Sequence, residues 1–318
     1  MTTEDGTQGP RRAGERPSGN PRREAMAQTE QVLGDLPLER IFAKARDEGL
    51  WVSSAPAEAV QEAAPEVKRI PVGVRPHSVA VSPDGTRLYV TDFGESSVSV
   101  IDAYGEAVVA SHPVGESPYG VAVSPDGTDL YVAATGPGTV TQYSVSGDDL
   151  VQDGSILSAD DHSKRPYAMA VGPDGRVYVT LALSDTVLVT DRFLKNPTSI
   201  PDIDFPVAVA VSKDNARIYA TNYFSKSVSV IDASGKAALA KISVGNEPYG
   251  VAVSPDGTRL YVAHFPGTGS VSVVDVAGQK VVSTIPVGDG PRGVAVSPDG
   301  TRLYVTNFFA DSLSVVML

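Results

Sequence analysis

The sequence predicts an all-β protein, a β-propeller built from four-stranded antiparallel blades, and two observations carry that prediction. One phrase recurs along the chain, sometimes with substitutions: Pro, two residues, Val-Ala-Val-Ser-Pro-Asp-Gly, two residues and Leu-Tyr-Val. A repeat of about 40 residues, with no helical periodicity between its copies, is typical of propeller blades. The copies are separated by 42, 48, 40, 42 and 43 residues and begin at Pro76, Pro118, Pro166, Pro206, Pro248 and Pro291.

Each part of the repeat predicts one element of a blade. The alternating Val-Ala-Val segment favours a strand, and Leu-Tyr-Val, rich in β-branched and aromatic residues, favours the strand that returns beside it. Pro-Asp-Gly between them favours a tight turn, because glycine accepts the positive φ that such a turn requires. A Ser-Val-Ser-Val phrase and an apolar run ending in Val-Gly then supply a third and a fourth strand. The aspartate of the turn is expected to be structural.

The sequence predicts seven blades, with six as the alternative. Residues 32–37 match the phrase that precedes every other repeat, and residues 50–53 match the returning strand. Pro37 would therefore open a degenerate first blade. Residues 38–49 lack the Ser-Pro-Asp-Gly turn, however, and fit a short amphipathic helix on a six-bladed ring equally well.

The last repeat ends at Leu318, after its third strand, so its fourth strand is expected from an N-terminal segment that closes the ring. Residues 29–33 would supply this strand in a ring of seven blades and residues 67–72 in a ring of six. We expect residues 1–26 to form a disordered tail, because they are polar and rich in Gly, Pro and Arg. Residues 27–318 are then a single propeller domain.

Composition excludes several classes of function. The net charge of −12 repels phosphate backbones and anionic headgroups, so we expect neither nucleic acid nor membrane as a partner. The absence of cysteine excludes disulfides, thiolate metal sites and cysteine nucleophiles. The N-terminal residues lack the apolar core of a signal peptide, so we expect a cytoplasmic protein. We also expect it to be a monomer.

The strand written here as Tyr304-Val305-Thr306-Asn307, together with its counterparts, resembles the YVTN family of β-propeller repeats. The resemblance is clear over about residues 66–318 and weak over residues 30–65. It implies a propeller similar to the sugar-lactone lactonases and the streptogramin lyases, and to many surface proteins. Because one fold supports many functions, the resemblance supplies candidate activities and does not choose among them.

Topology predicts where a site would lie. The Pro-Asp-Gly turns join the first and second strands of each blade at one face of the ring, so the starts of the first strands and the ends of the second strands meet at the opposite face. We call that end of the channel the channel mouth, and ligand sites are expected there because loops converge on a concavity. The distinctive residues at the mouth are His77, Asp92, Asn222, Tyr223, Tyr249, His264, Phe265, Arg292, Asn307 and Phe308.

Two classes of function remain open. The first is a binding or interaction protein that presents a site for a small molecule or protein at the mouth. Its lining would be Asn222, Tyr223, Tyr249, Phe265, Asn307 and Phe308. The second is a hydrolase or lyase acting on a lactone-like or cyclic ester. Its catalytic groups would be His264, His77 and Asp92, with Arg292 stabilising an oxyanion.

Three of the candidate residues also suggest a cofactor. His77, Asp92 and His264 could together hold a divalent metal ion, since imidazole and carboxylate are common ligands. The alternative for each of them is a hydrogen-bonded residue at the end of a loop on the channel rim.

Overall fold

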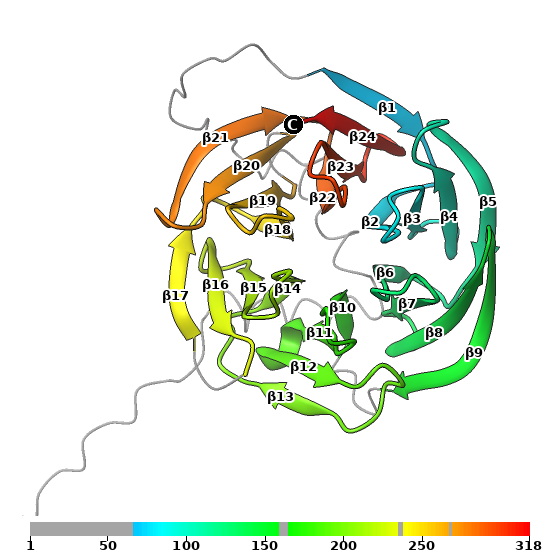
Figure 1. Ribbon diagram of the computed structural model, residues 1–318, viewed down its shortest axis with the longest axis horizontal. Coiled ribbons are helices and arrows are strands. Elements are labelled where there is room, and N and C mark those ends of the chain that lie inside the picture. The colour runs from blue at the N-terminus through cyan, green and yellow to red at the C-terminus, as the bar shows by residue number, and fades with distance from the viewer. Residues whose placement is uncertain (1–65, 159–164, 235–237, 267–268) are drawn as a thin grey trace, which may run out of the picture. The chain divides into compact units, whose positions relative to one another are not determined.

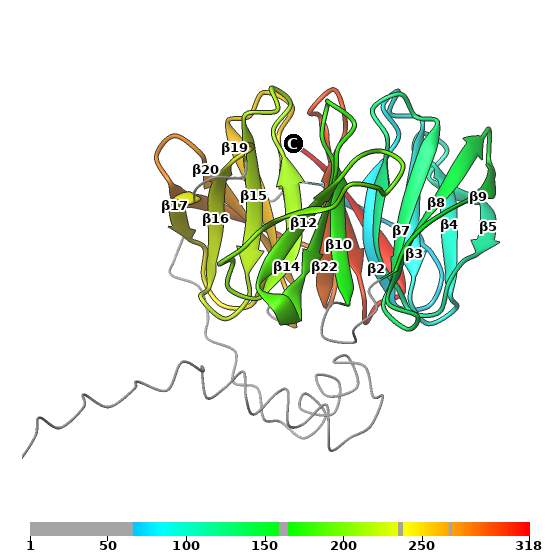
Figure 2. The same ribbon diagram turned by 90° about the horizontal axis from the view of Figure 1, so that it is seen from below.

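The computed structural model describes residues 66–158, 165–234, 238–266 and 269–318. These residues form six four-stranded antiparallel sheets, or blades, arranged around a central channel (Figure 1). The strands stand side by side along the channel direction, with turns at both ends (Figure 2). Within the described ranges, no helix is long and apolar enough to cross a membrane.

In blades I to III the strands follow one another outward from the channel in chain order. Blade I consists of β2 (Pro76–Val81), β3 (Arg87–Asp92), β4 (Ser97–Asp102) and β5 (Ala107–Pro113). Blade II consists of β6 (Pro118–Val123), β7 (Asp129–Ala134), β8 (Thr139–Ser146) and β9 (Asp149–Ser158). Blade III consists of β10 (Pro166–Val171), β11 (Val177–Leu181), a 3-10 turn (Ala182–Ser184), β12 (Thr186–Thr190) and β13 (Thr198–Ile200).

Blades IV and V repeat this order, and blade VI combines both ends of the described chain. Blade IV consists of β14 (Pro206–Val211), β15 (Arg217–Asn222), β16 (Ser227–Asp232) and β17 (Ala238–Ser243). Blade V consists of β18 (Pro248–Val253), β19 (Arg259–His264), β20 (Ser270–Asp275) and β21 (Lys280–Pro286). Blade VI consists of β22 (Pro291–Val296), β23 (Arg302–Asn307), β24 (Ser312–Met317) and β1 (Val67–Pro71).

The prediction of seven blades is wrong, and the described residues form the six of the stated alternative. The reason is the place of β1, which pairs antiparallel with β24, Val67 lying opposite Val316. It therefore takes the fourth position of blade VI, which the prediction of seven blades had assigned to residues 29–33. The expected first blade at Pro37 and the expected tail of residues 1–26 lie outside the described residues.

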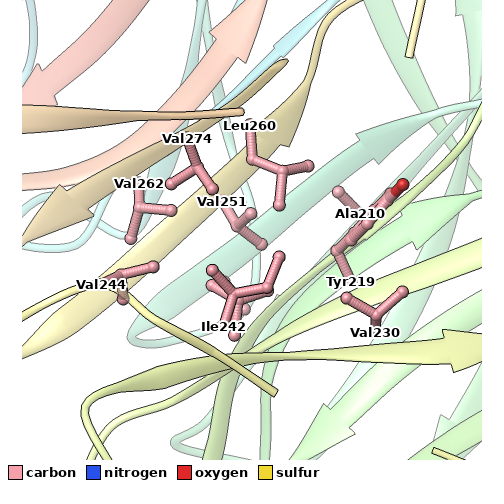
Figure 3. Close-up of a cluster of buried hydrophobic side chains, with 11 residues drawn as sticks. Ala210, Tyr219, Val230, Ile242, Val244, Val251, Leu260, Val262 and Val274 are labelled. Carbon is pink, nitrogen blue, oxygen red and sulfur yellow. The ribbon is translucent and has the colours of Figure 1, made fainter. Parts of the chain in front are cut away.

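Packing between neighbouring blades forms the core. Each first strand contacts the first strands of both neighbours, and β22 contacts β2. Between blades IV and V, side chains such as Tyr219 and Val230 pack towards Val251 and Leu260 (Figure 3). Burying such apolar surface stabilises the fold by about 25 cal/mol per Å². The blades are thus held to one another chiefly by their apolar faces.

The turn of each repeat explains its Ser-Pro-Asp-Gly phrase. In blade I the Ser82 hydroxyl donates to Asp84 Oδ1 (2.5 Å), which also accepts the Thr86 amide (3.0 Å). The Ser82 oxygen accepts the Arg87 amide in turn (2.9 Å). The structural role expected for the turn aspartates is confirmed. The same serine–aspartate bond occurs at Asp126, Asp214, Asp256 and Asp299.

A threonine near the end of the second strand joins one blade to the next. The first two strands of blade I pair through a bulge between Pro76 and Val79. Within this bulge, Thr91 Oγ1 accepts the Ser78 amide (3.0 Å) and donates to the carbonyl of Tyr119 in blade II (2.8 Å). A single hydroxyl therefore satisfies a bulge amide and a carbonyl of the neighbouring blade. Thr221 bridges in the same way to Tyr249, and Thr306 to His77.

Replacing Thr306 by valine should destabilise the ring. Thr306→Val keeps the shape of the side chain but leaves the Gly293 amide and the His77 carbonyl without this hydroxyl. We expect the free energy of unfolding to fall by about 1–3 kcal/mol, measured by urea denaturation. Thr284→Val, on the outer strand β21, is the control and should change it by less than about 0.5 kcal/mol. Equal effects of the two substitutions would contradict a bridging role for Thr306.

Candidate functional site

The second residue of each first strand lies at the channel mouth, as topology predicts. These six side chains are buried, so the mouth is largely filled by the protein's own groups. In chain order they are His77, Tyr119, Tyr167, Val207, Tyr249 and Arg292.

His77 links two of these side chains. Its ring lies 4.1 Å from the ring of Tyr119, measured between centroids, and its Nε2 is 3.1 Å from the Tyr249 hydroxyl. Burial lowers the pKa of His77 well below its usual value, and the positive charge of Arg292 lowers it further. The imidazole is therefore neutral at physiological pH.

Arg292 is the most unusual side chain of the mouth, because it is a charged group with no exposed surface. Its guanidinium carbon lies 3.7 Å from the ring centroid of Phe308, 3.8 Å from that of Phe265 and 5.1 Å from that of Tyr249. A cation held against aromatic faces away from water gains about 2 kcal/mol from such contacts. Aromatic rings thus replace part of the hydration that the guanidinium loses.

Further aromatic side chains surround this group. Phe265 stacks on Phe309 with a centroid separation of 5.4 Å, and Phe308 lies edge-on to Phe265 at 5.7 Å. In the neighbouring blade IV, Tyr223 contacts Phe205 and Phe224. Phe309 and Phe224 remain partly exposed, so aromatic surface is available at the rim.

A small cavity of about 90 Å³ opens at this end of the channel. All six first strands contribute to its lining, which includes His77, Tyr249 and Arg292 together with small or apolar residues. The strands converge so closely that a Cβ added at Gly250 would lie 2.1 Å from the Arg292 carbonyl oxygen. The cavity therefore suits a small polar group rather than a large substrate.

The fourth residue of the Tyr-Val-Thr-Asn phrase points elsewhere. Asn307 Nδ2 donates to the hydroxyls of Ser312 (3.1 Å) and Ser314 (2.9 Å) on the third strand of its own blade. Asn222 does the same to Ser227 (3.0 Å) and Ser229 (2.9 Å). Both amides are completely buried. They hold strands of one blade together rather than facing the channel cavity.

Asp92 and His264 occupy the equivalent positions of blades I and V. The Ser99 hydroxyl donates to Asp92 Oδ2 (2.6 Å). His264 places Nδ1 2.7 Å from the Asn246 carbonyl and Nε2 2.7 Å from the Ser272 hydroxyl. Burial raises the pKa of Asp92 to about 7 and lowers the pKa of His264. Each of the two side chains thus bonds to a serine on the third strand of its own blade.

The glycine of the Val-Gly phrase packs against the side chain of the fourth residue of the Tyr-Val-Thr-Asn phrase. A Cβ at Gly73 would lie 2.4 Å from Asp92 Cγ, and a Cβ at Gly288 would lie 2.3 Å from Asn307 Cγ. The glycine therefore gives the fourth side chain the space that it needs. This contact accounts for a phrase whose role the sequence alone did not explain.

The structure does not bring the expected metal ligands together. His77 lies at the channel, whereas Asp92 and His264 bond within separate blades. Among the described residues, no three His, Asp or Glu side chains are grouped so that they could hold a metal ion. The groups brought together are instead His77, Tyr249, Arg292, Phe265 and Phe308.

Sequence reasoning missed the serine partners of the fourth position, although the sequence contains a signal for them. Where the fourth residue is polar, the next strand begins Ser-x-Ser. Where it is Ala134, the next strand begins Thr-Val-Thr, and where it is Leu181, it begins Thr-Val-Leu. In all four blades the second of these serines bonds to the polar residue, and where that residue is asparagine the first serine does so too.

Comparison with known proteins supports the propeller fold but does not identify a family or an activity. No protein-family model matches the chain, and no curated protein matches it. Among solved structures it is similar to a chain of hydrazine synthase from Kuenenia stuttgartiensis, with a TM-score of 0.60 and 21% identity. The match covers 84% of this chain and 99% of that chain. The resemblance to the YVTN family and to lactonases stays a prediction.

Asp92→Asn should remove a pH dependence from the stability of the protein. The carboxyl of Asp92 has a pKa of about 7 when folded and about 4 when unfolded. Its contribution to stability is therefore complete below about pH 4 and is lost as the pH rises towards 7. The loss is of the order of 2–4 kcal/mol. Urea denaturation of both proteins between about pH 4 and pH 8 should show the variant gaining relative stability as the pH rises.

The matched control for this prediction is Asn307→Asp. Asn307 bonds to Ser314, the counterpart of the Ser99 that bonds to Asp92, and has the equivalent glycine contact in blade VI. We expect the new carboxyl to introduce the same downward slope with rising pH. Parallel pH profiles for the wild-type protein and Asp92→Asn would contradict the raised pKa.

Proposed function

We propose that this chain is a β-propeller binding protein that receives a ligand or partner with an anionic group at the channel mouth. The observation that carries the proposal is Arg292, a fully buried guanidinium that borders the channel cavity. Propellers present loops and channel ends to other molecules, so the fold itself fits a binding role.

Charge supports an anionic group. The cavity lining contains the guanidinium of Arg292, together with His77, whose pKa burial lowers well below its usual value. No Asp or Glu is among the described residues that line it. The interior of the mouth is thus locally positive in a protein whose net charge is −12. A carboxylate or phosphate oxygen suits such a site, because charge-assisted hydrogen bonds to arginine are strong at low dielectric.

The aromatic rim supports an organic ligand rather than a free ion. Phe309 and Phe224 are partly exposed beside the buried rings of the mouth. A ligand with an apolar body could contact these rings while its anionic group enters the cavity. The sequence-based choice of Tyr249, Phe265 and Phe308 as lining residues is part of this proposal.

Binding is a better account of the site than catalysis. A general base must come within about 2.6–3.2 Å of the proton that it removes. Asp92 and His264 instead bond to Ser99 and Ser272 inside their own blades. No observation on the described residues favours a hydrolase or lyase.

Thermal denaturation with matched ligands tests the proposal. Benzoate combines an aromatic body with a carboxylate, and benzamide has nearly the same shape without the charge. We expect benzoate to raise the melting temperature by an amount that grows with its concentration, and benzamide to have little effect. Arg292→Met should abolish the benzoate shift, since methionine can fill the space between the two phenylalanine rings without a charge.

The controls separate binding from catalysis. His264→Asn places in blade V the residue that blades IV and VI carry, and it should leave the benzoate shift unchanged. Equal shifts with benzoate and benzamide, or an undiminished shift in Arg292→Met, would contradict an anion site at the mouth. Hydrolysis of a lactone or ester that His264→Asn abolished would favour the enzyme instead.

A further inference from the structure

The cavity at the channel mouth has a polar half and an apolar half. Its lining comes from all six first strands, which follow one another around the channel (Figure 1). Blades V, VI and I contribute every polar side chain of the lining, beside small and apolar ones: Tyr249, Arg292, His77 and Ser78. Blades II, III and IV contribute only Val121, Ala168, Met169, Val207, Ala208 and Val209. Each half is continuous, because β22 contacts β18 and β2, while β10 contacts β6 and β14.

Ser78 adds a hydroxyl to the polar half, where every other blade has glycine or alanine. Its amide donates to Thr91 Oγ1 (3.0 Å), but its hydroxyl forms no hydrogen bond with the residues that the structure describes. Ser78 lies directly beside the strand of Arg292, since a Cβ added at Gly293 would lie 2.6 Å from Ser78 Cα. A hydroxyl and a guanidinium on neighbouring strands suit a carboxylate, which accepts hydrogen bonds and donates none.

The apolar half offers a ligand no hydrogen bond from a side chain among the described residues that line it. Val207 stands where the other blades carry histidine, tyrosine or arginine at the mouth. The tyrosines of blades II and III, Tyr119 and Tyr167, are not among the lining residues and pack against each other, with ring centroids 5.2 Å apart. Water finds few partners in such surroundings, so an apolar group that displaces it is favoured.

The volume of the cavity limits the size of the ligand. A single water needs about 10–15 Å³ of such space, so a cavity of about 90 Å³ holds roughly six water-sized groups. The first strands also approach one another closely around it. A Cβ added at Gly120 would lie 2.8 Å from Ala168 Cα, just as one at Gly250 would meet the Arg292 carbonyl. A short flexible chain suits this narrow space better than a planar ring does.

We propose that the channel cavity binds a short-chain aliphatic carboxylate whole, with its charged end in the polar half and its chain in the apolar half. The carboxylate would accept hydrogen bonds from Arg292 and Ser78, and the alkyl chain would lie against Met169, Val207 and Val209. This inference rests on the proposed anion site at the mouth and adds to it the class of ligand. Inorganic phosphate and sulfate lack the chain that the apolar half requires, and benzoate would keep its ring at the aromatic rim.

Calorimetric titration of the full chain with butanoate, acetate and butanamide tests this proposal. Butanoate extends acetate by two methylene groups, and each buried methylene strengthens binding about fourfold. We therefore expect butanoate to bind about tenfold more tightly than acetate. Butanamide keeps the chain but lacks the charge, so it should bind at least about tenfold more weakly than butanoate.

Variants that follow the repeat itself test each half of the cavity. Val209→Met gives blade IV the residue that blade III carries and reduces the apolar space. It should lower the affinity for butanoate to that for acetate, while the acetate affinity and the benzoate shift stay unchanged. Combining it with Met169→Val exchanges the two residues at constant volume and should restore butanoate binding, which separates lost space from misfolding. Ser78→Ala introduces the residue of blades III and IV and should weaken acetate and butanoate alike, about tenfold.

The outcomes separate this inference from the function on which it rests. Butanoate binding no more tightly than acetate would overturn the short-chain assignment, even where benzoate still raises the melting temperature. The same conclusion would follow if butanoate bound Val209→Met and Ser78→Ala as tightly as it binds the wild-type protein. If neither butanoate, acetate nor benzoate bound, the anion site at the mouth would itself be wrong.

Discussion

The threonine hydroxyl that bridges two blades is the interaction on which the channel mouth depends. It binds a bulge amide of its own blade and a carbonyl of the next blade, and those carbonyls belong to Tyr119, Tyr249 and His77. The backbone of each of these mouth residues is thus held by the preceding blade. A neutral buried hydrogen bond contributes only about 1 kcal/mol net, but leaving its groups unpaired costs more. The positions of His77, Tyr119 and Tyr249 therefore depend on the blade that precedes each of them.

Residues that recur in the blades and residues that depart from the repeat have different roles. Recurrent polar groups, such as the turn aspartates and Asn222 or Asn307, are engaged in hydrogen bonds that build a blade. Arg292 departs from the repeat, since the other blades have a histidine, a tyrosine or a valine at its position. A side chain that could bind a ligand is therefore found where a blade departs from the repeat.

Sequence reasoning predicted the strands, the turns and the mouth, but not the number of blades or the direction of the fourth side chain. The pairing of β1 with β24 depends on contacts between distant segments, which periodicity does not specify. Asp92 and Val90 are two residues apart on β3, so their side chains lie on the same face of the sheet. Ser99 is directly opposite Val90, and it is therefore a diagonal neighbour of Asp92 on that face. The bulge between Pro76 and Val79 breaks the simple alternation by which the sequence placed side chains. Topology thus located the end of the strand, and the register between the second and third strands decided which way its side chain points.

Charge recurs regularly at one end of the ring and not in the interior of the mouth, and this follows from the repeat. Every Ser-Pro-Asp-Gly turn adds a carboxylate to one end, and hydrogen bonds within the turn keep it ionised, as for Asp84 and Asp126. The mouth end carries no such recurrent charge, so the single guanidinium of Arg292 dominates its interior. One substitution in a cavity lining without carboxylates can therefore create an anion site.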